Sequence, residues 1–255
     1  MSRPDVADRA SELLRLHHTG TTLVLPTVWD AWSARAVVAA GFPAISVGSH
    51  PLADSRGQRD NEGMTLADAL EGARRIADAV DVPVTLDAES GYDTPAAELV
   101  DRVLDAGVVG INIEDTVHSQ GRLRERQEHA DYIGEIRASA DAAGVELVIN
   151  ARTDAYVGSV AVFDDPLAEA LARLQACEAA GARCVYPVRV PDAASVRTLL
   201  DGLSGPLNLT AHPVTGGMAG SREELKALGV HRITFGPLLQ AALTETITEL
   251  VTPWR

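Results

Sequence analysis

The stretch Val-Thr-Leu-Asp-Ala-Glu-Ser-Gly-Tyr, Val84–Tyr92, decides how this chain folds and where its chemistry lies. It is an apolar, β-branched run that stops at the carboxylates Asp87 and Glu89. The run Gly110–Asp115, Gly-Ile-Asn-Ile-Glu-Asp, has the same character and also ends in acidic residues. Such runs are typical of buried parallel strands, whose C-terminal ends form the ligand-binding mouth of an α/β fold. We therefore expect several carboxylates to converge on one point.

Converging carboxylates repel one another unless a cation lies between them. A divalent cation removes this conflict, and Mg²⁺ prefers oxygen ligands of this kind. The two acidic strand ends, at Asp87 and Glu114, therefore indicate a magnesium site at the mouth of the fold.

An alternation of strand and helix patterns runs along the whole chain. The strand candidates are Thr22–Val28, Ala44–Gly48, Val82–Asp87, Gly110–Glu114, Leu147–Arg152, Cys184–Pro187, Leu207–Ala211 and Arg232–Gly236. The helix candidates are Pro4–His17, Ala31–Ala40, Leu66–Val80, Pro95–Ala106, Ala130–Ala143, Pro166–Ala180, Ala193–Leu203, Arg222–Leu228 and Leu238–Val251.

Eight strand–helix units predict a (β/α)8 TIM barrel, preceded by an extra N-terminal helix. No linker divides the chain, so we expect one domain over residues 1–255. The alternative is a doubly wound open sheet, which usually has fewer strands. No Gly-x-Gly-x-x-Gly turn follows the first strand here.

The composition excludes several classes of function. A net charge of −14 and a pI of about 4.8 argue against binding to nucleic acid or to anionic membranes. The sequence has no long apolar run and no apolar signal core near its start, so we expect a cytoplasmic protein. Cys177 and Cys184 are expected to be buried and reduced rather than joined.

Polar side chains gather where the predicted strands end. Besides the acidic ends, the chain shows Trp29-Asp30, Gly48-Ser49-His50, Arg152-Thr153-Asp154 and His212 at these positions. Asp30 at a strand end can also serve only to cap the next helix. Arg152 either pairs with Glu114, holds a substrate carboxylate with its planar fork, or does both.

Two predicted loops are longer than ordinary connections. The segment 50–65 carries Asp60, and the segment 116–128 carries His118 and Arg122. We expect 116–128 to be a mobile lid in which Arg122 meets the far charge of a di-acid and His118 moves a proton. The alternative is a plain surface loop leading into the next helix.

Several segments, in this order, resemble one known family, the isocitrate lyase/phosphoenolpyruvate mutase superfamily. Its opening unit and three signatures are similar to Trp29–Arg35 with Ala40–Ile45, Asp87–Tyr92, Gly110–Asp115 and Ala151–Ala155. The likeness is good over residues 22–190 and looser beyond them.

The resemblance implies a magnesium-dependent barrel, with Mn²⁺ as an alternative metal, that makes or breaks C–C or P–C bonds beside a 2-oxo acid. Asp87 would be the main metal ligand, and Glu89 and Glu114 would bind metal directly or through water. The resemblance also gives roles to Arg152, Asp60, Gly48 and Ser49. With the two residues of the predicted lid, our catalytic set is Arg152, Glu114, Asp60, His118 and Arg122, and our substrate-binding set is Trp29, Ser46, Gly48, Ser49, Arg152 and His212.

The sequence also departs from this family. Its lyases carry a Lys-(Lys/Arg)-Cys-Gly-His run after the fourth strand, and its mutases carry an asparagine-bearing lid. The segment 116–128 has neither cysteine nor asparagine, and Glu89 replaces the usual second aspartate. The general acid–base, the substrate and the pathway are therefore open.

We predict a magnesium-dependent lyase that cleaves a C–C bond of a small 2-oxo or 2-hydroxy di-acid through a pyruvate-type enolate. The alternatives are a phosphoenolpyruvate phosphonomutase or phosphonopyruvate hydrolase, and a barrel that binds a 2-oxo acid without turnover. The resemblance further implies a homotetramer in which the last helix, Leu238–Val251, packs on a neighbouring subunit.

Overall fold

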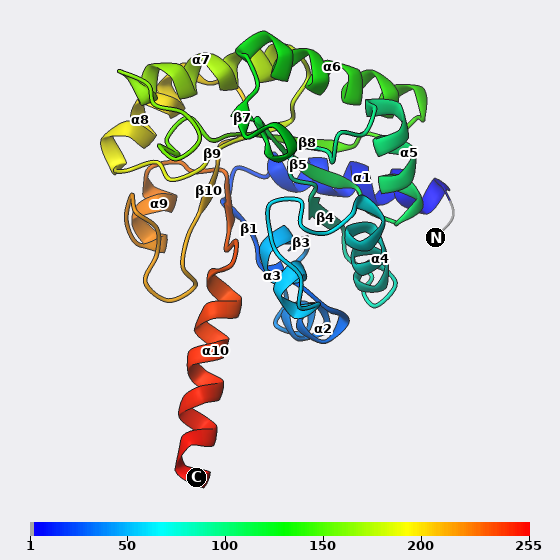
Figure 1. Ribbon diagram of the computed structural model, residues 1–255, viewed down its shortest axis with the longest axis vertical. Coiled ribbons are helices and arrows are strands. Elements are labelled where there is room, and N and C mark those ends of the chain that lie inside the picture. The colour runs from blue at the N-terminus through cyan, green and yellow to red at the C-terminus, as the bar shows by residue number, and fades with distance from the viewer. Residues whose placement is uncertain (1–2) are drawn as a thin grey trace.

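Parallel strands lie at the centre of the structure, a computed structural model that describes residues 3–255 (Figure 1). Residues 1–2 of the predicted domain lie outside the described part. The parallel strands are β1 (Leu23–Leu25), β2 (Thr27–Val28), β3 (Ile45–Val47), β4 (Val84–Asp87), β5 (Gly110–Glu114), β8 (Val148–Thr153), β9 (Cys184–Pro187), β10 (Asn208–Thr210) and β11 (Arg232–Thr234).

These strands close into the predicted barrel. One sheet has the order β2-β3-β4-β5-β8-β9 and the other the order β1-β11-β10. Pro26, which has no N–H to donate, separates β1 from β2, so the two are halves of one strand. A parallel bridge between Val185 and Leu207 joins β9 to the segment that enters β10. With β1 and β2 taken as one, the described chain forms an eight-stranded barrel, as predicted.

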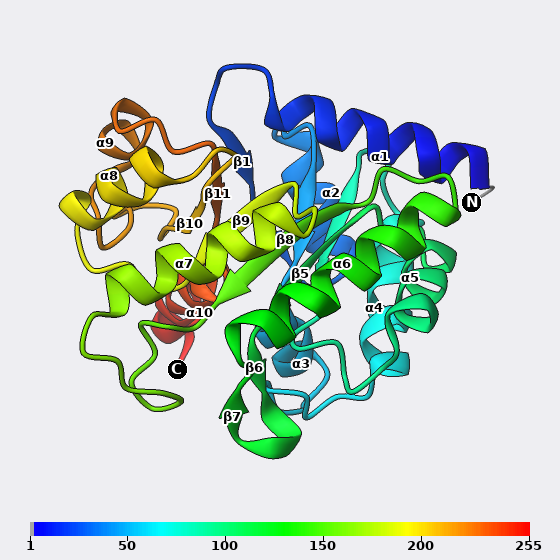
Figure 2. The same ribbon diagram turned by 90° about the horizontal axis from the view of Figure 1, so that it is seen from above.

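Helices surround this barrel on its outside (Figure 2). They are α1 (Arg3–His17), α2 (Ala31–Ala39), α3 (Ser49–Ser55), α4 (Leu66–Ala77), α5 (Ala96–Asp105), α6 (Arg126–Ala142), α7 (Pro166–Ala179), α8 (Ala193–Gly202), α9 (Arg222–Ala227) and α10 (Leu238–Val251). Asp30 caps α2, as its place at a strand end suggested, by accepting a hydrogen bond of 2.7 Å from Ser33 N–H.

The N-terminal helix α1 covers the end of the barrel where the strands begin. A Cβ on Gly110 would lie 2.9 Å from Leu13 Cδ2, which shows how closely α1 packs on β5. Arg9 of the same helix donates to the carbonyls of Val80 and Val82. Because this end is filled, ligands reach the barrel from the opposite end, where the strands stop.

Three local elements differ from the prediction. The segment 50–65 begins inside a short helix, α3, and the segment 116–128 contains β6 (Thr116–Val117), a 3-10 turn (His118–Gln120) and β7 (Arg122–Leu123). Helix α6 begins at Arg126 rather than Ala130, because Glu125 and Glu128 form a capping box at its start.

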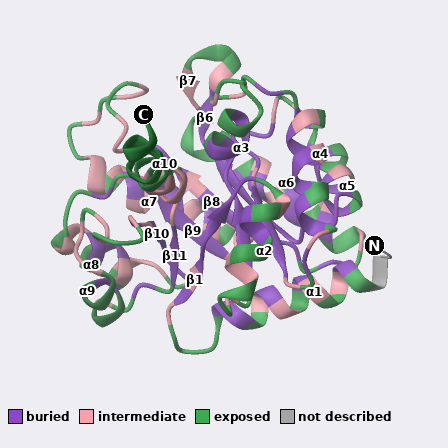
Figure 3. Cartoon of the chain, turned by 90° about the horizontal axis from the view of Figure 1, so that it is seen from below, coloured by how far each residue is buried: buried purple, intermediate pink, exposed green. Residues whose placement is uncertain are grey.

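The last helix, α10, projects away from the barrel (Figure 1), and none of its residues is buried (Figure 3). No helix within residues 3–255 is both long enough and apolar enough to cross a bilayer. Cys177 and Cys184 are buried and unpaired, as expected, and burial raises the pKa of their thiols to about 12 and about 11.

Candidate active site

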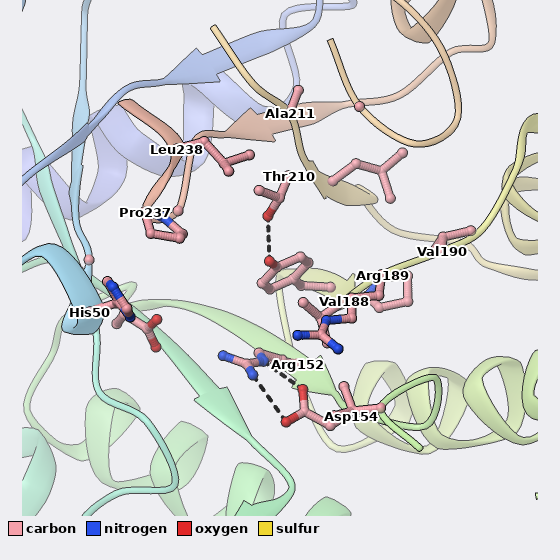
Figure 4. A pocket seen from close by; sticks show the side chains of 18 of the residues that line it. His50, Arg152, Asp154, Val188, Arg189, Val190, Thr210, Ala211, Pro237 and Leu238 are labelled. Atoms are coloured by element: carbon pink, nitrogen blue, oxygen red, sulfur yellow. Dashed lines mark hydrogen bonds and ion pairs between the residues drawn. The ribbon is translucent and has the colours of Figure 1, made fainter. Parts of the chain in front are cut away.

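A cavity of about 830 Å³ opens where the strands end (Figure 4). One part of it holds residues that the sequence pointed to: Gly48, Ser49, His50, Asp60, Asp87, His118, Arg152, Asp154 and His212. The other part holds residues that follow β9 and β10. A cavity of this volume is in the usual range for small-molecule sites.

Arg152 joins the acidic residues of two strands. Its Nη1 lies 2.5 Å from Glu114 Oε2, and its Nε and Nη2 donate to the two carboxylate oxygens of Asp154 at 2.7 and 3.0 Å. Burial alone would lower the pKa of Arg152, but the charges of Glu114 and Asp154 raise it well above its ordinary value. The guanidinium is therefore a permanent cation with a fixed orientation.

His118 connects Glu114 to Glu89. Its Nε2 lies 2.6 Å from Glu114 Oε1 and 3.8 Å from Glu89 Oε2. Glu89 also accepts hydrogen bonds from Tyr92 Oη at 2.8 Å and from the backbone N–H of Glu62. Burial, followed by the charge of Asp87, raises the pKa of Glu89 to about 8.

Asp87 lies at the end of β4 beside the cavity. Ser49 Oγ donates to its Oδ2 at 3.2 Å, and burial raises the pKa of the Asp87 carboxyl. Asp60 lies close enough that its charge raises this pKa further. One oxygen of Asp60, Oδ2, is 3.2 Å from His50 Nδ1, whereas the other, Oδ1, is buried and has no hydrogen-bond partner among residues 3–255.

This set of donors suits a hard divalent cation. Asp87, Glu89 and Glu114 offer carboxylate oxygens whose burial disfavours their charge, and Asp60 offers an unpartnered oxygen. Among the described residues, no group of three or more His, Cys, Asp or Glu side chains is already arranged as a metal centre. The assignment of metal ligands therefore stays a prediction.

Unusual backbone conformations surround these carboxylates. Glu89, Asn61 and Glu62 have φ values of 48, 62 and 58°, in the left-handed region that residues other than glycine rarely adopt. Backbone strain of this kind tends to gather at functional sites. It turns the Glu62 N–H toward Glu89 and holds the acidic side chains in place.

The structure separates the predicted substrate residues into two groups. Gly48, Ser49 and His212 line the cavity, as do the catalytic candidates Asp60 and His118. Trp29 and Ser46 are buried in the barrel wall and do not line it. Their role in substrate binding stays a prediction.

Arg122 is placed differently from the prediction. Its Nη1 and Nη2 donate to the two carboxylate oxygens of Glu128 at 2.7 and 2.6 Å, and it does not line the large cavity. Arg124 fixes the base of the same hairpin by donating to the carbonyls of Glu114 and Ser90. The hairpin is thus tied down at its root, and Arg122 pairs with Glu128 outside the large cavity.

Three groups of the site escaped sequence reasoning. Tyr186, in β9, and Arg189, just after it, line the cavity, and neither was among the predicted site residues. Asp115 is a support rather than a ligand, because it accepts from Thr153 Oγ1 at 2.6 Å and from Arg173 Nη1 at 3.3 Å. The signal for this role was that Asp115 and Thr153 follow register partners on neighbouring strands.

Comparison with known proteins agrees with this architecture. The sequence matches the family described as phosphoenolpyruvate phosphomutase over residues 13–253. The chain belongs to this family. It is 34% identical over 188 residues to the 2-methylisocitrate lyase of Escherichia coli (strain K12), which covers 69% of this chain and 61% of that protein. The chain thus spans less than two thirds of that relative's length.

Further relatives have related names. The chain is 32% identical over 211 residues to the oxaloacetate decarboxylase of Rhodopseudomonas palustris (strain ATCC BAA-98 / CGA009), covering 78% of this chain and 70% of that protein. The crystal structure of 2,3-dimethylmalate lyase superposes with a TM-score of 0.83 at 27% identity, covering 94% of this chain and 85% of that one. Family members are thus lyases and mutases of small acids, and they generally use a divalent metal.

Proposed function

We propose that this protein is a magnesium-dependent lyase that cleaves a C–C bond of a small 2-oxo or 2-hydroxy di-acid and releases a pyruvate-type enolate. The observation that carries the proposal is the fixed Arg152–Glu114 pair, which lies beside Asp87 at the mouth of the barrel. A cation, a set of carboxylate oxygens and an open cavity thus lie together, which supports the proposal.

Arg152 has donors left for a substrate. A guanidinium has five N–H groups, and one each on Nε, Nη1 and Nη2 is engaged by Asp154 and Glu114. Two N–H groups therefore remain for an oxyanion, and 20% of the side chain is exposed. A fixed donor of this kind stabilises negative charge that develops on a substrate oxygen.

The carboxylates would be the ligands of the predicted metal. Asp87, with Glu89 and Glu114, would hold Mg²⁺, which supplies Lewis-acid polarisation of a substrate oxygen. Asp115, bonded to Thr153 and to the backbone N–H of Asp154, holds the strand end that carries Arg152 in position. Ser49 orients Asp87 through its hydroxyl.

Neither cysteine replaces the acid–base cysteine of the related lyases. Cys177 lies in α7 and Cys184 in β9, both are buried, and neither lines the cavity. Isocitrate-type substrates need such a cysteine as general acid–base, so they are disfavoured here. A substrate whose bond breaks without a cysteine as general acid–base is favoured.

A rival reaction uses the same enolate at a P–C bond, as the phosphomutase description of the family suggests. Nuclear magnetic resonance separates the two. With Mg²⁺ present, the proton spectrum of a panel of 2-oxo and 2-hydroxy di-acids should show cleavage of one member. The phosphorus spectrum of phosphonopyruvate should stay unchanged. Conversion of phosphonopyruvate alone would assign the rival activity, and conversion of neither would overturn the proposal.

A further inference from the structure

A second arginine, Arg189, lines the same cavity. It follows β9 and Val188, and Figure 4 shows it on the side of the cavity opposite His50. Unlike Arg152, it has no hydrogen bond or ion pair to any other described residue. Arg189 is therefore an exposed cation on the cavity wall that no described acidic side chain pairs with.

The backbone of Arg189 is strained. Its φ is 60°, in the left-handed region where glycine is the usual residue. A side chain in this conformation leaves the strand direction, and here it is directed to the cavity. Strain retained at a cavity wall is a frequent sign of a functional position.

Apolar side chains make up much of the wall of the cavity that Arg189 lines. They are Val188, Val190, Leu209, Met218 and Leu238. The wall also contains His212, whose Nδ1 accepts hydrogen bonds from the N–H groups of Val214 and Thr215. The cavity as a whole therefore suits an aliphatic chain that ends in an anion.

We propose that Arg189 binds the second carboxylate of the substrate, at the end of an aliphatic arm, while Arg152 and the metal hold the 2-oxo or 2-hydroxy acid head. This inference rests on the proposed function for the head of the molecule. One uncompensated guanidinium matches one carboxylate, which it can hold with two parallel hydrogen bonds. A cavity of about 830 Å³ leaves room for an arm longer than that of a four-carbon di-acid.

The assignment also replaces Arg122, whose guanidinium is engaged by Glu128. Arg122 was the residue expected to neutralise the far charge of a di-acid, and Arg189 is the alternative. Only Arg189 lies in the cavity and has a free guanidinium.

Binding of acids that differ only at the far end tests the proposal. The probes are 2-oxoglutarate and 2-oxoadipate, each compared with the mono-acid of equal chain length, 2-oxopentanoate and 2-oxohexanoate. Calorimetry with Mg²⁺ should show that wild-type protein binds at least one di-acid at least tenfold more tightly than its mono-acid. Arg189→Gln should remove this preference, and Arg189→Lys should restore part of it.

Two controls separate the possible failures. Arg197→Gln, on the exposed face of α8, should keep the preference, and Arg189→Gln should bind oxalate, which has no arm, as wild type does. Three results would overturn the role of Arg189. The preference for the di-acid could persist in Arg189→Gln, it could be lost only in Arg122→Gln, or the wild-type protein could show no preference. Failure of the wild-type protein to bind oxalate would instead count against the proposed function. Because the di-acid preference is measured separately from oxalate binding, the two failures can be told apart.

Discussion

Glu114 and Arg152 are register partners on the adjacent parallel strands β5 and β8, and their side chains meet at 2.5 Å between Oε2 and Nη1. Glu114 is almost fully buried, with 2% of its side chain exposed. A buried carboxylate is costly unless it is paired. The pair therefore fixes the position of both groups at the barrel mouth, and removal of either partner should affect both stability and binding.

Arg152→Lys should lower kcat/KM by about 100-fold or more, equivalent to about 2.7 kcal/mol of transition-state binding. A lysine cannot reproduce the two parallel bonds to Asp154 and still reach Glu114. Steady-state kinetics on the substrate found in the screen would measure this. Arg126→Lys, in an exposed ion pair with Glu169, is the matched control and should be close to wild type. Equal activity in Arg152→Lys and wild type would show that Arg152 is not the substrate cation.

Asp87→Ala should abolish magnesium binding while the barrel stays folded. Asp87 is half-buried at a strand end, and among the described residues its carboxylate accepts hydrogen bonds only from the Ser49 hydroxyl and the Glu89 N–H. Calorimetric titration with Mg²⁺ measures the affinity, and circular dichroism monitors the fold. Asp105→Ala, on the exposed end of α5, serves as the control. Wild-type magnesium affinity in Asp87→Ala would place the metal elsewhere.

The stability of the protein should fall as the pH drops below about 6.5, in part because of His17. Burial, with a smaller effect of the charge of Arg232, lowers the pKa of His17 to about 3 from its ordinary value of 6.5. Between these pH values the unfolded chain binds a proton that the folded chain does not, so stability is full above pH 6.5 and is lost on acidification. The slope is about 1.4 kcal/mol per pH unit, or about 2 kcal/mol at pH 5.

Urea unfolding at pH 7 and pH 5 measures this loss. In His17→Gln the difference between the two pH values should shrink by about 2 kcal/mol. His18→Gln, at the exposed neighbouring position, should leave the difference unchanged. An unchanged pH dependence in His17→Gln would mean that the ring of His17 is protonated in the folded protein.

The protein should be a homo-oligomer, with a tetramer expected. Helix α10 has no buried residue, and Ile247, Leu250 and Val251 are 59, 67 and 55% exposed. An apolar face of this kind usually marks a contact with another chain. Light scattering should return four times 26.9 kDa. Ile247→Glu with Leu250→Glu should lower the mass, whereas Glu249→Lys, on the other side of the helix, should not. A mass of 26.9 kDa for the wild type at micromolar concentration would refute this.

The barrel could be predicted because local sequence and global fold agree. Gly110–Glu114 and Cys184–Pro187 were placed to the residue, since each is a short apolar run between turn signals. The carboxylates at the strand ends followed from the same runs. Helix α3 was missed because Pro51 resembles a loop signal, although proline is tolerated in the first turn of a helix.

Side-chain pairing was the part that the sequence could not supply. Arg122 and Arg189 are both polar residues in connecting segments, and nothing in their spacing says which has a partner. The structure shows that Arg122 forms an ion pair with Glu128. Arg189 instead has a backbone in the left-handed region, which is usual only for glycine and could not be foreseen from its residue type. Long-range contacts of this kind depend on the closed barrel rather than on local pattern.

The central claim is that Asp87, Glu114 and Arg152 form one cation-dependent site for the head of a 2-oxo acid. Calorimetric titration of the wild-type protein with oxalate, a flat mimic of the enolate, tests it most directly. We expect micromolar or tighter binding with Mg²⁺, and at least tenfold weaker binding with EDTA or in Asp87→Ala. Absence of binding, or equal binding with and without the cation, would contradict the account.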